Sequence, residues 1–459
     1  MDYDRQGLEI QRTLSGGVVA QTKRDRLGRV RFQNAVVNEL TTHLWREYDW
    51  NYDHRLASIT DHKNHHTTAF EYDDRGFLER AIYNRKEQVW RTADKLGNLY
   101  QSQEKNDRQY QSSQLQYDGK WYYYYDKEGN LILKSPFEGG YRGMSSQPRW
   151  SLGSWAYEWN ANGSLKKVKR SDGSVITFKY DAFGRRIEKK TARATTHFVW
   201  DGNVPLHEWK TFDYRETTDN DRITWIFQDF VPVAKLQGDK SYSIISDHIG
   251  TPLVAIDNEG VKVWERELDI YGKVRKETKE TPNFVPFRYQ GQYYDSEVDL
   301  CYNRFRYYDC NTGSYISQDP IRLAGGNPTI YGYVEDPNVW IDVFGLNEIN
   351  DLGQIGEINA GITKNTKKIP SDSGKKKFRI PDQMSLDERH ITEVKNVNYQ
   401  YFSSQLQDDL KHVNREGIQG KVTLIVDERT ILSKKLKEEI NKGNIELERK
   451  NLNKRNTCT

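Results

Sequence analysis

The sequence predicts a mainly β protein, in which a long, coiling antiparallel sheet is followed by a small α/β domain. Three observations support this prediction: aromatic residues are concentrated in the first three-quarters of the chain, a turn motif recurs there, and the composition changes near residue 347. All 12 Trp and 27 of the 29 Tyr precede residue 347. Because aromatic residues favour strands, residues 1–346 are expected to be β-rich. With 459 residues, the chain is also too long for one ordinary domain.

The recurrent turn motif consists of Tyr-Asp, two further residues and Gly. Clear copies begin at Tyr3, Tyr72, Tyr125 and Tyr180, and degenerate copies begin at Arg24, Tyr52 and Ala93. The Asp side chain can cap its own backbone and Gly can adopt a positive φ angle, so each copy predicts the turn of a β-hairpin. A single hairpin cannot bury its apolar face, and the repeats are therefore expected to join into one larger sheet.

Charge, cysteine content and hydropathy exclude few classes of function. Residues 347–459 contain 21 basic and 17 acidic residues, whereas residues 1–346 contain 48 and 49. The resulting charge of +4 on the tail is compatible with a nucleic-acid partner but is weak evidence for one. Cys301, Cys310 and Cys458 form no disulfide framework or CxxC metal motif. No apolar run approaches the roughly 20 residues of a membrane span and no signal peptide is present, so export is expected to need a specialised route.

Two longer stretches, residues 247–274 and 287–346, carry a more specific pattern that includes "FRYQGQYYD" and "YNRFRYYD". Together with the Tyr-Asp repeats, they resemble the YD repeats and the associated core of Rhs proteins. The resemblance implies a spiralled, hollow β-shell. It divides the chain into YD/Rhs repeats over residues 1–240, an Rhs-associated core over residues 241–346 and a C-terminal payload over residues 347–459. An unrelated carbohydrate-binding β-protein is the alternative.

The core ends in a stretch that resembles the self-cleavage signature of Rhs and related toxin-complex proteins, Pro-x-x-x-x-Asp-Pro-x-Gly-Leu. The matching residues are Pro337, Asp342, Gly345 and Leu346, and Val343 stands where the signature has Pro. The resemblance implies that the shell cuts its own chain between Leu346 and Asn347.

This self-cleavage resembles aspartyl-protease chemistry, which needs two carboxylates close enough to share a proton. The resemblance assigns Asp342 and Asp319 to that pair and Arg306 to a supporting basic position. Each assignment has a structural alternative. Asp319 can simply initiate the turn at Pro320, and Arg306 can pair with a surface carboxylate.

The tail is expected to fold as a small α/β sandwich. The pattern predicts a helix over residues 351–362, a loop and strand pair over 364–384, a strand over 390–397, a helix over 401–416, a strand over 421–428 and a helix over 433–443. In the 401–416 helix, apolar residues follow helical spacing at Phe402, Leu406, Leu410 and Val413.

An acidic pattern lies on these elements. Glu393 and Lys395 are two residues apart on a strand, so both side chains leave the same face, and Val394 is expected to enter the core. Asp382 ends a neighbouring strand. The order Glu357, Asp382, Glu393-Val394-Lys395, Gln405 resembles the PD-(D/E)xK nucleases, and "GITKNTKKIPSDSGKKKFRIPD" followed by "ITEVKNV" resembles a restriction-endonuclease-fold toxin family.

The resemblance implies a metal-dependent nuclease. Asp382 and Glu393, helped by Glu357, would hold Mg²⁺ or Mn²⁺, and Lys395 would orient and acidify the attacking water. Gln405 would position the lysine or the phosphate, although Gln407 is an equally plausible amide. Basic residues expected to contact nucleic-acid phosphates are Lys364, Lys367, Lys368, Lys375, Lys376, Lys377 and Arg379. An isolated Glu-x-Lys pattern has the alternative explanation of an exposed ion pair.

Taken together, the resemblances imply an Rhs-type antibacterial toxin that encloses, cleaves and delivers its own nuclease. DNA is the favoured substrate. RNA on the same fold is the nearest alternative, and a non-catalytic binding or adhesion module is another. The toxin is expected to be made in the bacterial cytoplasm, to be exported by a type VI or similar secretion system with chaperone components, and to act in the cytoplasm of a target cell. An immunity protein is expected to protect the producer. The chain is expected to be either a fragment of a larger effector or a displaced gene end.

Overall fold

The structure is a computed structural model in two compact units. It describes residues 1–3, 9–26, 28–38, 41–52, 55–139, 149–322, 327–346, 367–371, 378–385, 387–395, 399–415, 420–428 and 430–450. The first unit, called the shell unit, comprises Met1–Asp2 and Glu9–Glu348, and the second, called the C-terminal unit, comprises Tyr3–Leu8 and Ile349–Thr459. In the described part of the chain, no helix has the length and apolar character that a membrane crossing needs.

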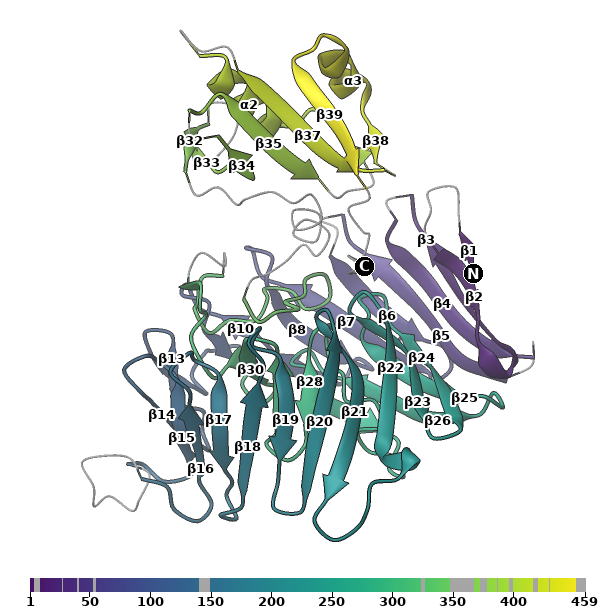
Figure 1. The fold of residues 1–459 in the computed structure, drawn as a ribbon, viewed down its shortest axis with the longest axis vertical. Coiled ribbons are helices and arrows are strands. Elements are labelled where there is room, and N and C mark those ends of the chain that lie inside the picture. Colours follow the sequence, from purple (N-terminus) through teal and green to yellow (C-terminus); the bar gives the residue numbers. More distant parts are fainter. Residues whose placement is uncertain are drawn as a thin grey trace. The chain divides into compact units, whose positions relative to one another are not determined.

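The shell unit is built almost entirely of antiparallel strands that follow one another in chain order, as predicted (Figure 1). A 9-stranded sheet contains β1 (Asp2–Tyr3), β2 (Glu9–Thr13), β3 (Val18–Arg24), β4 (Val30–Val37), β5 (Thr41–Trp50), β6 (Leu56–Asp61), β7 (His66–Tyr72), β8 (Leu78–Tyr83) and β9 (Glu87–Trp90). A short pair, β10 (Thr92–Ala93) and β11 (Leu99–Tyr100), follows it, and the 3-10 turns are η1 (Ser15–Gly17) and η2 (Asp219–Asp221).

A 16-stranded sheet continues the same pattern. Its strands are β12 (Gln109–Gln111), β13 (Gln114–Tyr117), β14 (Tyr122–Tyr125), β15 (Leu131–Ser135), β16 (Trp155–Trp159), β17 (Leu165–Lys169), β18 (Val175–Tyr180), β19 (Arg186–Lys190), β20 (Ala194–Asp201), β21 (Val204–Phe212), β22 (Arg222–Gln228), β23 (Val231–Gln237), β24 (Lys240–Ser246), β25 (Pro252–Asp257), β26 (Lys262–Leu268) and β27 (Val274–Glu277). A 4-stranded sheet completes the unit with β28 (Tyr293–Asp295), β29 (Leu300–Asn303), β30 (Arg306–Asp309) and β31 (Ser314–Tyr315).

The predicted turn chemistry is present in the turn between β18 and β19. Oδ1 of Asp181 accepts the backbone N–H groups of Phe183 and Arg185, both at 2.9 Å, and the Gly184 N–H donates to the Asp181 carbonyl at 3.0 Å. Gly184 has φ +75°, which an L side chain rarely adopts. The Asp caps the turn and the Gly supplies its backbone conformation, which explains why the two recur together.

The two large sheets share an apolar cluster. Val18, Ala35, Val37 and Leu44 of the first sheet pack with residues of β24 and β25. Where η1 meets the turn before β26, a Cβ atom on Gly16 would lie only 2.8 Å from Cα of Gly260. The beginning of the first sheet is therefore fixed against the end of the second.

The 4-stranded sheet packs against the larger sheet through aromatic and charged side chains. Tyr302 and Tyr307 lie in one buried cluster with residues of β13 to β18. Beside it, Asp295 accepts hydrogen bonds from Nη2 of Arg186 at 3.1 Å and from Nζ of Lys189 at 2.9 Å. Asp295 is fully buried, and two cations compensate its charge.

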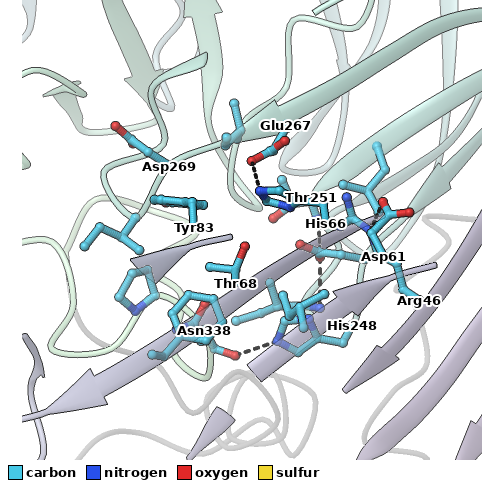
Figure 2. A pocket seen from close by; sticks show the side chains of 18 of the residues that line it. Arg46, Asp61, His66, Thr68, Tyr83, His248, Thr251, Glu267, Asp269 and Asn338 are labelled. Atoms are coloured by element: carbon cyan, nitrogen blue, oxygen red, sulfur yellow. Dashed lines mark hydrogen bonds and ion pairs between the residues drawn. The ribbon is translucent and has the colours of Figure 1, made fainter. Parts of the chain in front are cut away.

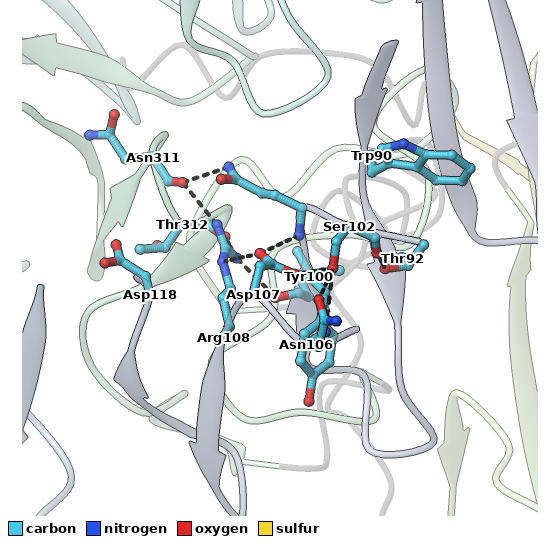
Figure 3. A network of polar contacts seen from close by, with 12 residues as sticks. Trp90, Thr92, Tyr100, Ser102, Asn106, Asp107, Arg108, Asp118, Asn311 and Thr312 are labelled. Carbon is cyan, nitrogen blue, oxygen red and sulfur yellow. Dashed lines mark hydrogen bonds and ion pairs between the residues drawn. The ribbon is translucent and has the colours of Figure 1, made fainter. Parts of the chain in front are cut away.

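A second buried arginine joins the strands before β12 to the core (Figure 3). The guanidinium of Arg108 donates to the carbonyl oxygens of Leu99 at 2.9 Å, Thr312 at 2.7 Å and Asn311 at 3.0 Å. One side chain thereby satisfies a carbonyl group of β11 and two in the loop that follows β30, so this contact positions that loop.

Buried or half-buried histidines lie in the interior of the shell unit. His66 and His248 line a cavity of about 90 Å³ (Figure 2). Nε2 of His248 donates to the carbonyl oxygen of Asn338 at 2.9 Å, and His66 lies 3.8 Å from Glu267. His43 donates to the Gly260 carbonyl at 2.8 Å. Burial lowers the pKa of all three imidazoles below the ordinary value of 6.5.

The C-terminal unit has a 4-stranded sheet in the order β34-β35-β37-β39. Its elements are β32 (Ile369–Pro370), β33 (Phe378–Arg379), β34 (Gln383–Met384), β35 (His390–Lys395), β36 (Tyr399–Gln400), α2 (Ser404–Val413), β37 (Lys421–Asp427), β38 (Ile431–Leu432), α3 (Lys434–Asn441) and β39 (Ile445–Lys450). β34 is antiparallel to β35, whereas β35, β37 and β39 are parallel. Ser403 and Ser433 cap the two helices.

The predicted elements of the tail that the structure describes are present, whereas the strands β36, β38 and β39 were not predicted. The apolar stripe of α2 packs on the sheet, with Leu406 and Val413 fully buried. β39, with the sequence "IELERK", was missed because charged residues alternate with its two buried or half-buried apolar residues. Parallel pairing with β37 orders it. The helix predicted over residues 351–362 lies outside the described residues.

We expect the shell unit to lose stability as the pH falls below about 6.5, the ordinary histidine value. Each folded-state pKa is lowered, so the unfolded chain binds more protons below that pH. Thermal unfolding between pH 7.5 and 5.5 should show the melting temperature falling by several degrees. A variant with His43, His66 and His248 all replaced by Gln controls for carboxylate titration and should lose less. Equal pH slopes in the two proteins would contradict this explanation.

Candidate active sites

The candidate nuclease site lies at the C-terminal end of β35. Glu393 and Lys395 project from the same face of the strand, as their spacing predicts. This face also carries Ile391, which belongs to the apolar cluster under α2. Val394 is buried, but it is not part of that cluster. The expected burial of Val394 is confirmed, and Glu393, which lies on the opposite face that α2 covers, is buried as well, at 0% exposed.

Three side chains meet at this end of the strand. Nζ of Lys395 lies 2.6 Å from Oε2 of Glu393 and 3.3 Å from Oδ2 of Asp382. The backbone N–H of Val394 donates to Oδ2 of Asp382 at 2.8 Å, and the N–H of Asp382 donates to Oε1 of Glu393 at 3.3 Å. The pairing of β34 with β35 thus brings together the three residues that the sequence pattern singled out.

Burial dominates the electrostatics of this site. It raises the pKa of Glu393 to about 7, with Lys395 acting in the opposite direction and Asp382 adding to the increase. For Lys395, burial lowers the pKa, but Glu393 and Asp382 outweigh it, so the net pKa is raised. The lysine is therefore a cation held between two carboxylates.

Asp409 on α2 was not predicted as part of this site. It is 0% exposed, and neither carboxylate oxygen has a hydrogen-bond partner among the described residues. Burial, followed by the charge of Glu393, raises its pKa to about 8. A signal was present in the sequence, because Asp409 falls between Leu406 and Val413 on the apolar stripe of the helix.

The two amides predicted for this site, Gln405 and Gln407, lie in different surroundings on α2. Gln405 is half-buried and lies one helical turn before Asp409, on the same side of α2. Nε2 of Gln407 donates to the carbonyl of Phe402 at 3.3 Å, so this amide supports the start of the helix. Glu357 lies outside the described residues.

Two of the predicted phosphate-binding residues already form ion pairs within the protein. Nε of Arg379 lies 2.6 Å from Oδ2 of Asp408. Lys367 pairs with Glu388. Lys368 is exposed. The remaining residues of this set lie outside the described residues: Lys364, Lys375, Lys376 and Lys377.

When ionised, the carboxyl groups of Asp382, Glu393 and Asp409 outnumber the one ammonium group, that of Lys395, so the donor set suits a hard divalent cation. The carboxylate of Asp409 is a buried acceptor that no described side chain or backbone group satisfies. Within the described ranges, however, no three His, Cys, Asp or Glu side chains are grouped closely enough to hold a metal ion. Direct protein ligands among these residues are therefore limited to a pair, Asp382 and Glu393.

A second acidic site lies at the end of the shell unit. Nη2 of Arg306 lies 2.9 Å from Oδ2 of Asp319 and 3.3 Å from Oδ2 of Asp342. Arg306 and Asp342 are nearly completely buried, and Tyr315 donates to Oδ2 of Asp342 at 2.8 Å. Burial raises the pKa of Asp319, an increase that the charge of Arg306 opposes. Arg306 is thus not a surface residue, and the two predicted carboxylates share its guanidinium.

The residues around the predicted scissile bond are held by the same site. The backbone N–H of Leu346 donates to Oδ1 of Asp342 at 3.0 Å. Arg306 also donates to the carbonyl of Gly345. Asp319 additionally caps the turn at Pro320, because its Oδ1 accepts the Ile321 N–H at 2.8 Å. Its structural role and the predicted catalytic role are therefore compatible. Asn347 lies outside the described residues.

Both the β-rich part of the chain and its tail are similar to known protein families. Residues 23–324 match the family Teneurin YD-shell, and residues 353–436 match Restriction endonuclease fold toxin 7. The "Probable deoxyribonuclease RhsA" of Dickeya dadantii (strain 3937) is 32% identical over 277 residues, covering 58% of this chain and 18% of the relative. The "Double-stranded DNA deaminase toxin A" of Burkholderia cenocepacia (strain H111) is 28% identical over 397 residues, covering 77% of this chain and 26% of the relative.

A solved structure titled "Crystal Structure of TcdB2-TccC3" has a TM-score of 0.42 and 17% identity, covering 75% of this chain and 22% of that one. The chain thus spans about a fifth to a quarter of the length of these relatives. Because the first family match covers more than half of the chain, the chain belongs to the Teneurin YD-shell family, and its tail carries a restriction endonuclease fold toxin domain.

Proposed function

We propose that the C-terminal unit is a metal-dependent endonuclease that hydrolyses phosphodiester bonds in DNA. The observation that carries this proposal is the contact of Lys395 with both Glu393 and Asp382 at the end of β35. Both carboxylates are fixed by backbone N–H groups, so binding a cation requires only that the ammonium group of Lys395 shifts from between them.

Each residue has a distinct role in this proposal. Asp382 and Glu393 hold Mg²⁺ or Mn²⁺, with Glu357 as a further carboxylate. The cation supplies Lewis-acid stabilisation of negative charge on the phosphate oxygens. Lys395 orients the attacking water and stabilises charge that develops during the reaction. Gln405 contacts the phosphate or the lysine from the same side of α2 as Asp409.

DNA is favoured over RNA by the printed names of two relatives, the probable deoxyribonucleases RhsA and RhsB of Dickeya dadantii (strain 3937). RNA is the second candidate substrate, since none of the described site residues provides a test for a 2′-hydroxyl group.

We also propose that the shell unit cuts the chain between Leu346 and Asn347. This is supported by the convergence of Asp319 and Asp342 on Arg306, and by the contact of Asp342 with the N–H of Leu346. One carboxylate acts as a base for water and the other as an acid. Val343, which replaces the usual Pro, is buried. With Val343 in this place, Asp342 still contacts Arg306 and the N–H of Leu346.

The last part of the proposal concerns how the protein is exported and in which cell it acts. We infer that the chain acts as an antibacterial toxin, released from its shell and delivered into the cytoplasm of a competitor by a type VI or similar secretion system. A relative carries the name "Toxin protein Tse5" of Pseudomonas aeruginosa and is 31% identical over 216 residues. A producer of such a nuclease needs an immunity protein that binds the tail.

Lys395→Ala is expected to reduce plasmid cleavage in Mg²⁺ by about 100-fold or more, because the ammonium group stabilises charge in the reaction. Conversion of supercoiled DNA to nicked and linear forms measures the rate, and RNA of matched length tests the second substrate. Lys421→Ala is a matched control, since this exposed lysine lies at the opposite end of the same sheet. Equal rates for wild type and Lys395→Ala would refute the proposed nuclease site.

Asp342→Asn is expected to abolish self-cleavage, because an amide cannot exchange the proton that the carboxylate pair shares. Intact-mass spectrometry should find two fragments of the wild type, divided after Leu346, and one whole chain of the variant. Asp201→Asn, an exposed position on β20, serves as the control and should be cleaved. A wild-type chain that stays whole would show that the shell unit does not cleave here.

A further inference from the structure

Two adjacent aspartates on α2 are equally buried but have opposite surroundings. Oδ2 of Asp408 accepts hydrogen bonds from Nε of Arg379 at 2.6 Å and from Oγ of Ser371 at 2.7 Å. Asp409 has no hydrogen-bond partner among the described residues, although its side chain is fully inaccessible to solvent. Burial without a partner strongly destabilises the ionised form of Asp409 and raises its pKa, so a nearby cation is what would favour the carboxylate.

The charged groups that act most on Asp409 are Glu393, Lys395 and Asp382 of the proposed nuclease site, followed by the neighbouring Asp408. The one cation among them, Lys395, already contacts the carboxylates of Glu393 and Asp382. When all four groups are ionised, three carboxylates and one ammonium group carry an excess of two negative charges, and without a cation the raised pKa values of Glu393 and Asp409 let protons neutralise part of that charge. A divalent cation would compensate that excess, whereas Lys395 alone does not.

Direct coordination of the cation by Asp409 is not indicated, because the described residues contain no group of three acidic or His/Cys side chains close enough for it. Hard divalent cations such as Mg²⁺ commonly keep several water molecules when they bind to proteins. A carboxylate beyond the direct ligands can accept hydrogen bonds from such water and strengthen binding.

We propose that Asp409 is a positioning residue of the cation site, whose carboxylate holds a divalent cation through ordered water while Asp382 and Glu393 bind it directly. This inference rests on the proposed nuclease function. It assigns the third carboxylate to the middle of α2, where the sequence pattern had pointed only to the amides Gln405 and Gln407.

The test measures binding of Mn²⁺ alone to the full-length chain, by calorimetry, and thermal unfolding with and without Mn²⁺. Asp409→Asn should weaken Mn²⁺ binding by on the order of 10–100-fold. Without Mn²⁺ at about pH 9, above the raised pKa of Asp409, the same variant should melt a few degrees higher than wild type, because a buried uncompensated charge is removed. Asp409→Glu should retain most of the Mn²⁺ affinity.

Asp408→Asn is the matched control, since it makes the same substitution one residue away. It should melt lower than wild type, because Arg379 loses its buried partner, and its Mn²⁺ affinity should be unchanged. A structural role for Asp409 would give Asp409→Asn the same result as this control.

Unchanged Mn²⁺ affinity in Asp409→Asn would overturn the inference and leave the nuclease proposal intact, provided that wild type binds Mn²⁺ and cleaves plasmid DNA. A lower melting temperature of Asp409→Asn without Mn²⁺ at the same alkaline pH would also overturn it, because protein contacts would then stabilise the carboxylate. A wild-type chain that neither binds Mn²⁺ nor cleaves DNA would overturn the inference and the proposed function together.

Discussion

The C-terminal unit depends on the placement of one ammonium group between two carboxylates beneath a helix. Lys395 lies against Glu393 and Asp382, and α2 covers the face of the sheet from which Glu393 projects. Burial makes each charge costly alone, so the three groups are stable only as a set. Parallel pairing of β35 with β37 and antiparallel pairing with β34 bring the set together. The acidic excess that remains, including Asp409, is the physical reason to expect a cation there.

The shell unit uses the same principle of compensated burial. Asp295 is paired with Arg186 and Lys189, and Asp319 and Asp342 share Arg306. In each case, charges on the 4-stranded sheet or the loops that follow it meet charges from another segment. These contacts fix the end of the shell unit, where the chain passes Gly345 and Leu346. A rigid, buried carboxylate pair next to that segment is suited to a reaction on its backbone.

Much of the fold was predictable from local sequence. The Asp-x-x-Gly turns have a direct physical cause in side-chain capping and positive φ angles, as Asp181 and Gly184 illustrate. α2 was evident from helical periodicity, and Glu393 and Lys395 from strand periodicity. β39 was not predicted, because its order comes from parallel pairing with β37 and not from its own charged sequence.

The two candidate sites were predictable only in part, because their geometry also depends on tertiary packing. Sequence spacing places Glu393 and Lys395 on one face of a strand, but it does not say which face the helix covers. The burial of Glu393, and the position of Asp409 on the packed side of α2, depend on that choice. The pairing of Arg379 with Asp408 is likewise tertiary, so a residue interpreted as free to bind phosphate turned out to hold the helix.

The most direct measurement is a crystal structure of the full-length chain with Mn²⁺, in which anomalous scattering locates the ion. An anomalous peak in contact with the carboxylates of both Asp382 and Glu393, with Asp409 facing it across ordered water, is the expected result. The central claim would be contradicted by Mn²⁺ binding elsewhere, or by a site in which Lys395 still joins the two carboxylates and excludes the ion at saturating Mn²⁺.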